Sequence, residues 1–201
     1  MTQPKTKLLG LILAGGFSRR MGQDKSLMNY HGKPQIEYVH DLLLQYCDKV
    51  FLSKRQEQST YQSIPPIDDD ESFSKIGPLG GILSAMKLYS DVSWIVMACD
   101  LPFVSTKTLQ TLINQRDPSK ISTAFRSVHD GLPEPLCTIL EGHAYEKILE
   151  YFKKGIQCPR KVLINSDIKL LEQLNPRWLD NVNDSKEFSQ AVDLLKGEEN
   201  C

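Results

Sequence analysis

The sequence predicts an α/β fold with a mostly parallel β-sheet, because short apolar segments alternate with segments of helical periodicity over its first two-thirds. Residues 8–13 (LLGLIL) and 93–99 (SWIVMAC) have the composition of buried strands, and the second suits a central parallel strand covered on both faces. With 201 residues, 40% of them hydrophobic, the chain is long enough for one well-buried core and short for two. We therefore expect residues 1–201 to form one domain, with a disordered tail at 197–201.

The individual elements follow from local patterns. Pro34 suits the first turn of a helix, and apolar side chains recur at helical spacing after it. Ser105 or Thr106 can cap a later helix, and Asp184 has capping-box spacing to Glu187. We expect strands at residues 8–13, 49–53, 64–67, 93–99, 120–126 and 136–140, the third weakened by two prolines. We expect helices at residues 34–47, 54–61, from just after the 77–81 segment to about 89, 105–114, 141–153 and 185–196, with short irregular pieces over 155–176.

Charge and composition argue against several classes of protein. Lys and Arg number 24 against 25 Asp and Glu, which gives no electrostatic case for nucleic acid or a membrane surface as a general partner. The apolar segments fall far short of the ~20 residues of a membrane span. The N-terminus, MTQPKTK, is polar, so we expect no cleavable signal and a cytoplasmic location. The five cysteines and four histidines are scattered without a CxxC pair, and a zinc site or disulfide framework is not expected.

The segment after the first predicted strand has the features of a polyanion site. Gly15 and Gly16 let the backbone turn sharply and present N–H groups to a phosphate. Arg19, Arg20 and Lys25 would neutralise a triphosphate, the arginines through a planar fork and the lysine as a point charge. The spacing matches neither a P-loop nor GxGxxG, and the alternative is a tight turn before a solvated basic loop. We favour contact with the phosphates of a nucleotide.

Asp100 directly follows the most hydrophobic predicted strand. A carboxylate in such a place is costly unless it is paired or binds a metal ion. Magnesium prefers few carboxylates, combined with waters and substrate phosphates. The alternative is a helix cap, but Ser105 and Thr106 lie nearer to the start of the following helix. We therefore predict that Asp100 is a Mg²⁺ ligand.

Three polar segments, 14–25, 68–81 and 100–102, follow predicted strands and would gather at one edge of a parallel sheet. In the second, Asp70 is a candidate for base recognition or a second metal, although acidic loops are usually only solvated. The glycines of 77–81 would allow close approach of a nucleoside, or simply form a turn into a helix. Asn181 and Asn183, taken alone, are better explained as turn or cap residues. The four histidines receive no catalytic role and are expected at the surface or at interfaces.

Together these residues carry a resemblance to a known family. Residues 13–27, LAGGFSRRMGQDKSL, resemble the LAGGxSxRMGxDKxL signature of nucleotidyltransferases with a Rossmann-like, GT-A-like fold. The double arginine, the Met-Gly and the following HGKP are most similar to the MobA-type molybdenum cofactor guanylyltransferases. Four downstream segments fall in that family's order and spacing: IDDDESFSKIGPLGGILSAM, ACDLPFVS, LPEPLCTIL and DNVNDSKEF.

The resemblance implies roles residue by residue. The nucleotide would be held by the Leu13–Lys25 loop, and Lys25, with Arg19 or Arg20, would bind the phosphates and stabilise the leaving pyrophosphate. Asp100 would bind both GTP and Mg²⁺, and Asn181 and Asn183 would lie near the metal and the acceptor. The nucleotide-binding set is Leu13, Ala14, Gly15, Gly16, Lys25, Asp70, Gly77, Pro78, Leu79, Gly80 and Asp100.

The implied reaction is transfer of GMP from Mg-GTP to the molybdopterin phosphate of molybdenum cofactor. Proteins that insert molybdenum and molybdoenzyme chaperones would be candidate partners. Two alternatives stay open: the same chemistry with CTP or a sugar-phosphate acceptor, and a non-catalytic nucleotide-binding module or molybdopterin carrier. Lys25 together with Asp100 argues against the module. Ser53 stands where the family often has asparagine. Asp184 stands where the family has threonine after its Asn-x-Asn motif, and it can still cap the following helix but does not keep the chemistry of threonine.

Overall fold

The structure is a computed structural model, and it describes residues 7–14, 25–54, 61, 63–182 and 184–199. Its strands are β1 (Leu8–Leu13), β2 (Lys49–Lys54), β3 (Pro66–Asp68), β4 (Ser93–Ala98), β5 (Ser122–Arg126), β6 (Pro133–Leu140) and β7 (Ile168–Leu171). Its helices are α1 (Gln35–Leu44), α2 (Pro78–Leu88), α3 (Thr106–Asn114), α4 (Ala144–Lys153), α5 (Pro159–Ile164) and α6 (Ser185–Glu199), with 3₁₀ turns η1 (Lys25–Leu27) and η2 (Glu71–Phe73).

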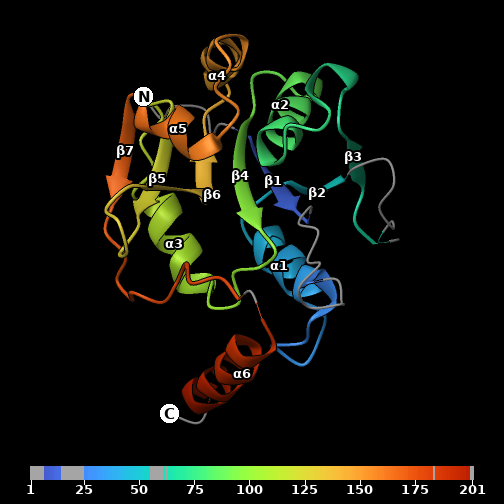
Figure 1. The fold of residues 1–201 in the computed structure, drawn as a ribbon, viewed down its shortest axis with the longest axis vertical. Coiled ribbons are helices and arrows are strands. Elements are labelled where there is room, and N and C mark those ends of the chain that lie inside the picture. Colours follow the sequence, from blue (N-terminus) through green and yellow to red (C-terminus); the bar gives the residue numbers. More distant parts are fainter. Residues whose placement is uncertain (1–6, 15–24, 55–60, 62, 183, 200–201) are drawn as a thin grey trace.

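The described strands form a seven-stranded sheet in the order β3-β2-β1-β4-β6-β5-β7 (Figure 1). Strand β1 pairs in parallel with β2 and β4, β2 with β3, and β5 with β7. Strand β6 is antiparallel to both of its neighbours, β4 and β5. All the other described strands therefore point the same way, which confirms the predicted mostly parallel α/β sheet.

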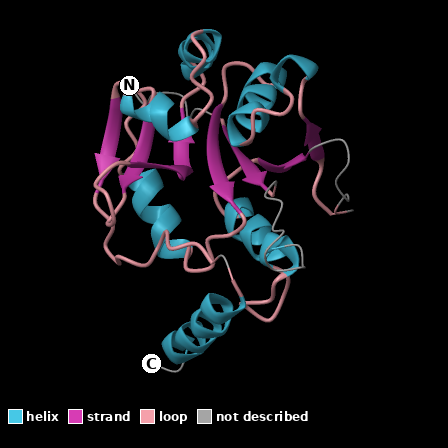
Figure 2. Cartoon of the chain, viewed as in Figure 1, coloured by secondary structure: helices cyan, strands magenta, loops and turns pink. Residues whose placement is uncertain are grey.

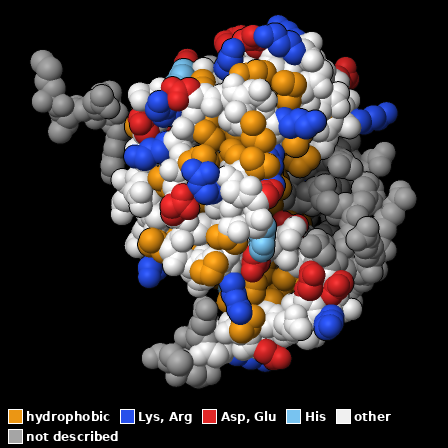
Figure 3. Space-filling model, turned by 60° about the vertical axis from the view of Figure 1, so that its left-hand side comes forward, with side chains coloured by type: hydrophobic (Ala, Val, Ile, Leu, Met, Phe, Trp, Pro, Cys, Tyr) orange, Lys and Arg blue, Asp and Glu red, His pale blue; other side chains and the backbone are white. Residues whose placement is uncertain are grey.

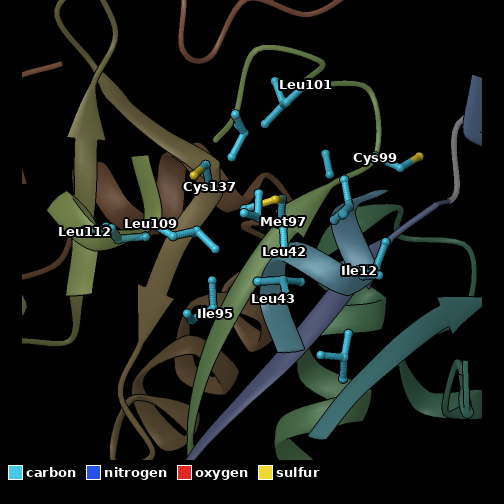
Figure 4. Close-up of a cluster of buried hydrophobic side chains, with 14 of the residues drawn as sticks. Ile12, Leu42, Leu43, Ile95, Met97, Cys99, Leu101, Leu109, Leu112 and Cys137 are labelled. Atoms are coloured by element: carbon cyan, nitrogen blue, oxygen red, sulfur yellow. The ribbon is translucent and has the colours of Figure 1, made fainter. Parts of the chain in front are cut away.

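Helices cover both faces of the sheet (Figure 2). On one face, α1 and α3 pack on alternate strand residues such as Ile12 and Ile95, and Figure 4 shows this cluster converging around Leu43 and Met97. On the other face, α2, α4 and α5 pack on the intervening residues, such as Leu11 and Trp94. This alternation follows from the pleat of a strand, in which successive side chains point to opposite faces.

Helix α6 lies apart from the sheet at one end of the molecule (Figure 1). Its apolar face, which includes Phe188, packs on Met28, Tyr30 and Val182. The predicted cap is confirmed, because the Asp184 carboxylate accepts hydrogen bonds from the backbone N–H groups of residues 186 and 187, at 2.9 and 2.8 Å. The helix continues to Glu199, past the predicted end at 196 and into the expected tail. No helix in the described ranges is long and apolar enough to cross a membrane.

Element boundaries differ from the predictions in several places. Helix α1 ends at Leu44 rather than at residue 47, and its last turn tightens there because the Tyr46 N–H donates to the Leu43 carbonyl three residues before it. Strand β6 begins at Pro133, three residues before the predicted start, because Arg126 pairs with Pro133 across a hairpin. The irregular region resolves into α5 and β7. The short helix predicted at 54–61 lies mostly outside the described residues, and its first residue belongs to β2.

Helix α2 begins earlier than predicted, at Pro78, so Gly80 and Gly81 belong to its first turn. A Cβ atom on Gly81 would lie 2.0 Å from the Ser53 hydroxyl oxygen, and one on Gly80 would lie 2.4 Å from the Phe73 carbonyl oxygen. Both glycines therefore let the helix backbone approach β2 and η2 without a side chain between them. Gly77, which precedes the helix, has a φ of +70°, a value that favours glycine.

We expect Gly81→Ala to lower the free energy of unfolding by about 1–3 kcal/mol, because the new methyl group overlaps the Ser53 side chain. Adding Ser53→Ala should restore part of this loss. Gly197→Ala is the matched control, since nothing lies within 4 Å of a Cβ there, and it should stabilise α6 by about 1 kcal/mol. Urea unfolding measures all three, and wild-type stability in Gly81→Ala would contradict the packing argument.

Candidate functional site

The candidate site lies at the carboxyl ends of the central strands. Leu13, the last residue of β1, pairs with Ser53 on β2 and with Ala98 on β4, and its carbonyl accepts the Cys99 N–H at 3.3 Å. Ala14 and Asp100 therefore leave neighbouring strands at the same edge, as the sequence predicts for segments that follow parallel strands. Burial ends abruptly there, because Leu13, Ala98 and Cys99 are buried whereas Ala14 and Asp100 are partly exposed.

The structure accounts for the other predicted phosphate-binding residues only in part. Gly15, Gly16, Arg19 and Arg20 lie outside the described residues, as does Asn183 on the acceptor side. Lys25 is the first residue of η1, which leads into α1. The phosphate-binding role of this segment therefore stays a prediction.

The segment before α6 meets the backbone of Asp100. The Val182 N–H donates to the Asp100 carbonyl at 3.3 Å, which places the preceding residue, Asn181, next to the candidate metal ligand. Val182 is buried and Asn181 is exposed. Tyr30 lies in the same neighbourhood: burial raises the pKa of its hydroxyl, and the negative charge of Asp100 adds to this shift. The Tyr30 hydroxyl donates a hydrogen bond to the Met28 sulfur at 3.6 Å.

The loop after Asp100 is fixed by three side chains whose role has no clear signal in the sequence. Gln35 Nε2 donates to the Leu101 carbonyl at 3.3 Å, and the Tyr38 hydroxyl donates to the Val104 carbonyl at 3.0 Å. A His31 ring nitrogen lies 2.9 Å from the Pro102 carbonyl, and the ring stacks on Tyr38 with centroids 3.6 Å apart. His31 is thus partly buried and structural. The HGKP motif was the available signal, but sequence alone does not tell which loop it contacts.

The donor set at this edge fits Mg²⁺. Within the described part of the chain, no group of three or more His, Cys, Asp or Glu side chains could hold a metal ion alone. Magnesium does not need such a group, because it binds through one or two carboxylates together with substrate phosphates. Asp100 provides a carboxylate at a partly exposed strand end. This arrangement suits a metal ion shared with a polyphosphate.

Asp70 is engaged by its own surroundings. Its carboxylate accepts hydrogen bonds from Lys87 Nζ at 2.6 Å and from the Ser72 N–H at 2.9 Å, and its own N–H donates to the Ser84 hydroxyl at 2.8 Å. The lysine, followed by the Ser72 contact, lowers the pKa of Asp70 to about 2. Asp70 therefore joins η2 to α2 as an ionised residue, and its predicted contact with a base would have to share these oxygens.

The N-terminus of α2 presents only part of the predicted 77–80 segment. Gly77 is partly exposed and Pro78 is exposed, whereas Leu79 and Gly80 are buried. The Gly80 N–H donates to the Gly77 carbonyl at 3.0 Å. Any ligand at this helix end would therefore meet Gly77 and Pro78 first.

On the face seen in Figure 3, acidic and basic side chains are interspersed, so its described atoms form no broad basic surface.

This fold is the fold of nucleotidyltransferases. The molybdopterin-guanine dinucleotide biosynthesis protein A from Archaeoglobus fulgidus superposes with a TM-score of 0.75 at 21% identity, covering 94% of this chain and 99% of that one. The 2-C-methyl-D-erythritol 4-phosphate cytidylyltransferase from Thermus thermophilus gives 0.68 at 10% identity, covering 92% and 98%. At these identities the likeness shows the fold alone.

The family model of the MobA-like NTP transferase domain matches residues 10–170, and the chain belongs to this family. It is 31% identical over 208 residues to a probable molybdenum cofactor guanylyltransferase of Bacillus cereus strain ATCC 10987, covering 96% of this chain and all of that protein. It is 36% identical over 190 residues to a molybdenum cofactor biosynthesis bifunctional protein of Synechocystis, covering 92% of this chain. The match spans only 54% of the Synechocystis protein.

We expect Lys87→Met to raise the pKa of Asp70 from about 2 toward the ordinary carboxyl range, with the Ser72 N–H keeping part of the shift. A lowered folded-state pKa stabilises the fold above the unfolded-state pKa of about 3.9, and this stabilisation is lost as the pH falls toward the folded value. The melting temperatures of wild type and variant should therefore differ most above about pH 4 and converge toward pH 2.

Carboxyl ¹³C NMR titration measures the pKa of Asp70, and thermal melts at several pH values measure the stability difference. Lys147→Met is the matched control, because that lysine pairs with Glu150 on α4 and should leave the pKa of Asp70 unchanged. An unchanged Asp70 pKa in Lys87→Met would refute the assigned cause.

Proposed function

We propose that this protein transfers GMP from Mg-GTP to the molybdopterin phosphate of molybdenum cofactor, which forms the guanine dinucleotide cofactor and releases pyrophosphate. The observation that carries the proposal is the match to the Bacillus cereus guanylyltransferase over its whole length, which includes the segments that follow β1, β3 and β4. The common edge shared by Leu13, Ala14 and Asp100 supports it. The proposed unit is the whole chain acting as one nucleotidyltransferase domain, in the cytoplasm.

The residues would divide the substrate between them. Ala14, Gly15 and Gly16 would present backbone N–H groups to the phosphates, and Arg19, Arg20 and Lys25 would neutralise their charge. Asp70 and the start of α2, with Gly77 and Pro78, would lie on the guanosine side. Asp100 would hold Mg²⁺, which when bound withdraws charge from the phosphate oxygens. Asn181 and Asn183 would lie toward the acceptor.

The reaction needs positioning more than proton transfer. An oxygen of the acceptor phosphate attacks the α-phosphorus of GTP, and a new P–O bond forms. The bond from that phosphorus to the oxygen bridging the β-phosphate breaks, and pyrophosphate leaves with the electron pair. Because the acceptor oxygen is already ionised, no general base is required. The chain's residues therefore act by orienting two anions and by offsetting their mutual repulsion.

We expect purified protein to release pyrophosphate from Mg-GTP only when molybdenum cofactor is added. Asp100→Asn and Lys25→Ala should each lower this rate by about 100-fold or more, because the first weakens the proposed Mg²⁺ ligand and the second removes a cation that would neutralise the phosphates. Asp167→Asn, which removes an exposed ion pair with Lys120, is the control and should keep the wild-type rate. Near-normal rates in both site variants would overturn the residue assignment.

The same assay separates the alternatives. Faster turnover or tighter binding with Mg-CTP would replace GTP by CTP as the donor. GTP binding without any pyrophosphate release would favour a nucleotide-binding module. Proteins that insert molybdenum, and chaperones of molybdoenzymes, are the proposed partners for delivery and receipt of the cofactor.

A further inference from the structure

Gln35 connects the two sides of the proposed site. It is the first residue of α1. Its backbone N–H donates to the Met28 carbonyl at 2.8 Å, three residues beyond Lys25. Its side-chain Nε2 donates to the Leu101 carbonyl at 3.3 Å, one residue beyond Asp100. One residue thus holds both the chain that leaves the predicted phosphate loop and the chain that leaves the predicted metal ligand.

The side chain of Gln35 is a poor choice for stability alone. It is fully buried, at 0% exposure, and its Oε1 atom has no hydrogen-bond partner among the described residues. Burying an amide with an unmet acceptor costs free energy that an apolar side chain of similar volume would not cost. What the amide adds over such a side chain is the bond from Nε2 to the Leu101 carbonyl. That bond is the specific contribution to explain.

Two neighbouring side chains hold other carbonyls of the same loop, and the Leu101 carbonyl also accepts the backbone N–H of Val104, at 3.4 Å. His31 contacts the Pro102 carbonyl, and Tyr38 donates to the Val104 carbonyl. Both side chains are only partly buried. Gln35 holds the carbonyl next to Asp100, and of the three it is the one that is fully buried. Of these three side chains it therefore acts nearest to Asp100, whose own carbonyl accepts the Val182 N–H.

We propose that Gln35 is a positioning residue that sets Asp100 relative to the Lys25 segment. This inference rests on the proposed function, in which both residues act on one triphosphate. Misplacement of one reacting group by about 1 Å can cost on the order of 100-fold in rate, so a fixed link between the two segments has a direct kinetic value. Gln35 itself touches neither substrate nor metal in this proposal.

Gln35→Met tests the proposal, because methionine fills a similar volume but cannot donate to Leu101. We expect backbone hydrogen exchange of residues 99–104 to rise at least about threefold in the protein without ligands, as the loop loses an anchor. Mn²⁺ binding in the presence of GTP, followed by electron paramagnetic resonance, should weaken by about 5- to 20-fold. The rate of GMP transfer should fall about 10-fold or more, with the KM for GTP changed less than twofold.

Thr138→Val is the matched control, since it removes a buried side-chain hydrogen bond to the Thr123 carbonyl elsewhere in the sheet. It should lower the melting temperature without changing Mn²⁺ affinity. Gln35→Asn is the second variant, in case Gln35→Met does not fold. Its amide is one methylene shorter and should no longer reach Leu101, so the same losses are expected.

A double-mutant cycle shows whether Gln35 acts through Asp100. In an Asp100→Asn background, Gln35→Met should change Mn²⁺ affinity by less than about twofold. An equal effect in both backgrounds, or wild-type Mn²⁺ affinity and loop exchange in a folded Gln35 variant, would overturn the inference. If wild type transfers no nucleotide at all, the proposed function fails, whereas the exchange measurement still decides whether Gln35 anchors the loop.

Discussion

The parallel pairing of β1 with β2 and β4 is the constraint on which the site depends. Because these strands point the same way, whatever follows each of them emerges at the same edge. The strands β1 and β4 are buried along their whole length, so a polar group within either would lose its hydration. At the carboxyl ends of these strands, Ala14 and Asp100 are the first partly exposed residues, where a polar group can meet a ligand. Distant parts of the sequence meet at this edge because the strands that precede them are parallel.

The same close packing explains the glycines on the other side of the edge. Helix α2 reaches the sheet only because Gly81 passes Ser53 and Gly80 passes the Phe73 carbonyl without side chains. Ser53, which departs from the asparagine common in the family it resembles, has a buried hydroxyl at this contact. Asp70 then ties η2 to the same helix through Lys87. Several residues whose type suggests ligand binding are therefore also explained by packing. A ligand-binding role for them would come in addition to this structural role.

Sequence reasoning found the elements whose signal is local. The uninterrupted apolar segments gave β1 and β4 to within one residue, and the capping residue Asp184 gave the start of α6. Strand order and the reversed direction of β6 could not be derived, because they depend on contacts between distant segments. Strand β7 is a half-buried edge strand and lacks a clear pattern. The contacts of Gln35 were equally hidden, since a glutamine after a proline looks like any exposed first-turn residue until its loop partner is known.

The contacts around Asp100 form a closed ring of bonded and packed residues. Helix α6, which lies apart from the sheet (Figure 1), is part of this ring. Asp100 is bonded through its carbonyl to Val182, and Val182 packs with α6 on Met28 and Tyr30. Met28 is bonded to Gln35, which returns to Leu101 beside Asp100. Each step fixes the next, so the backbone of Asp100 is held from the strand behind it, from the C-terminal segment and from the start of α1. A reaction that depends on positioning needs this kind of redundancy. Helix α6 packs on Met28 and Tyr30 in a cluster separate from the two clusters that cover the sheet, and this packing would complete the support of the proposed site.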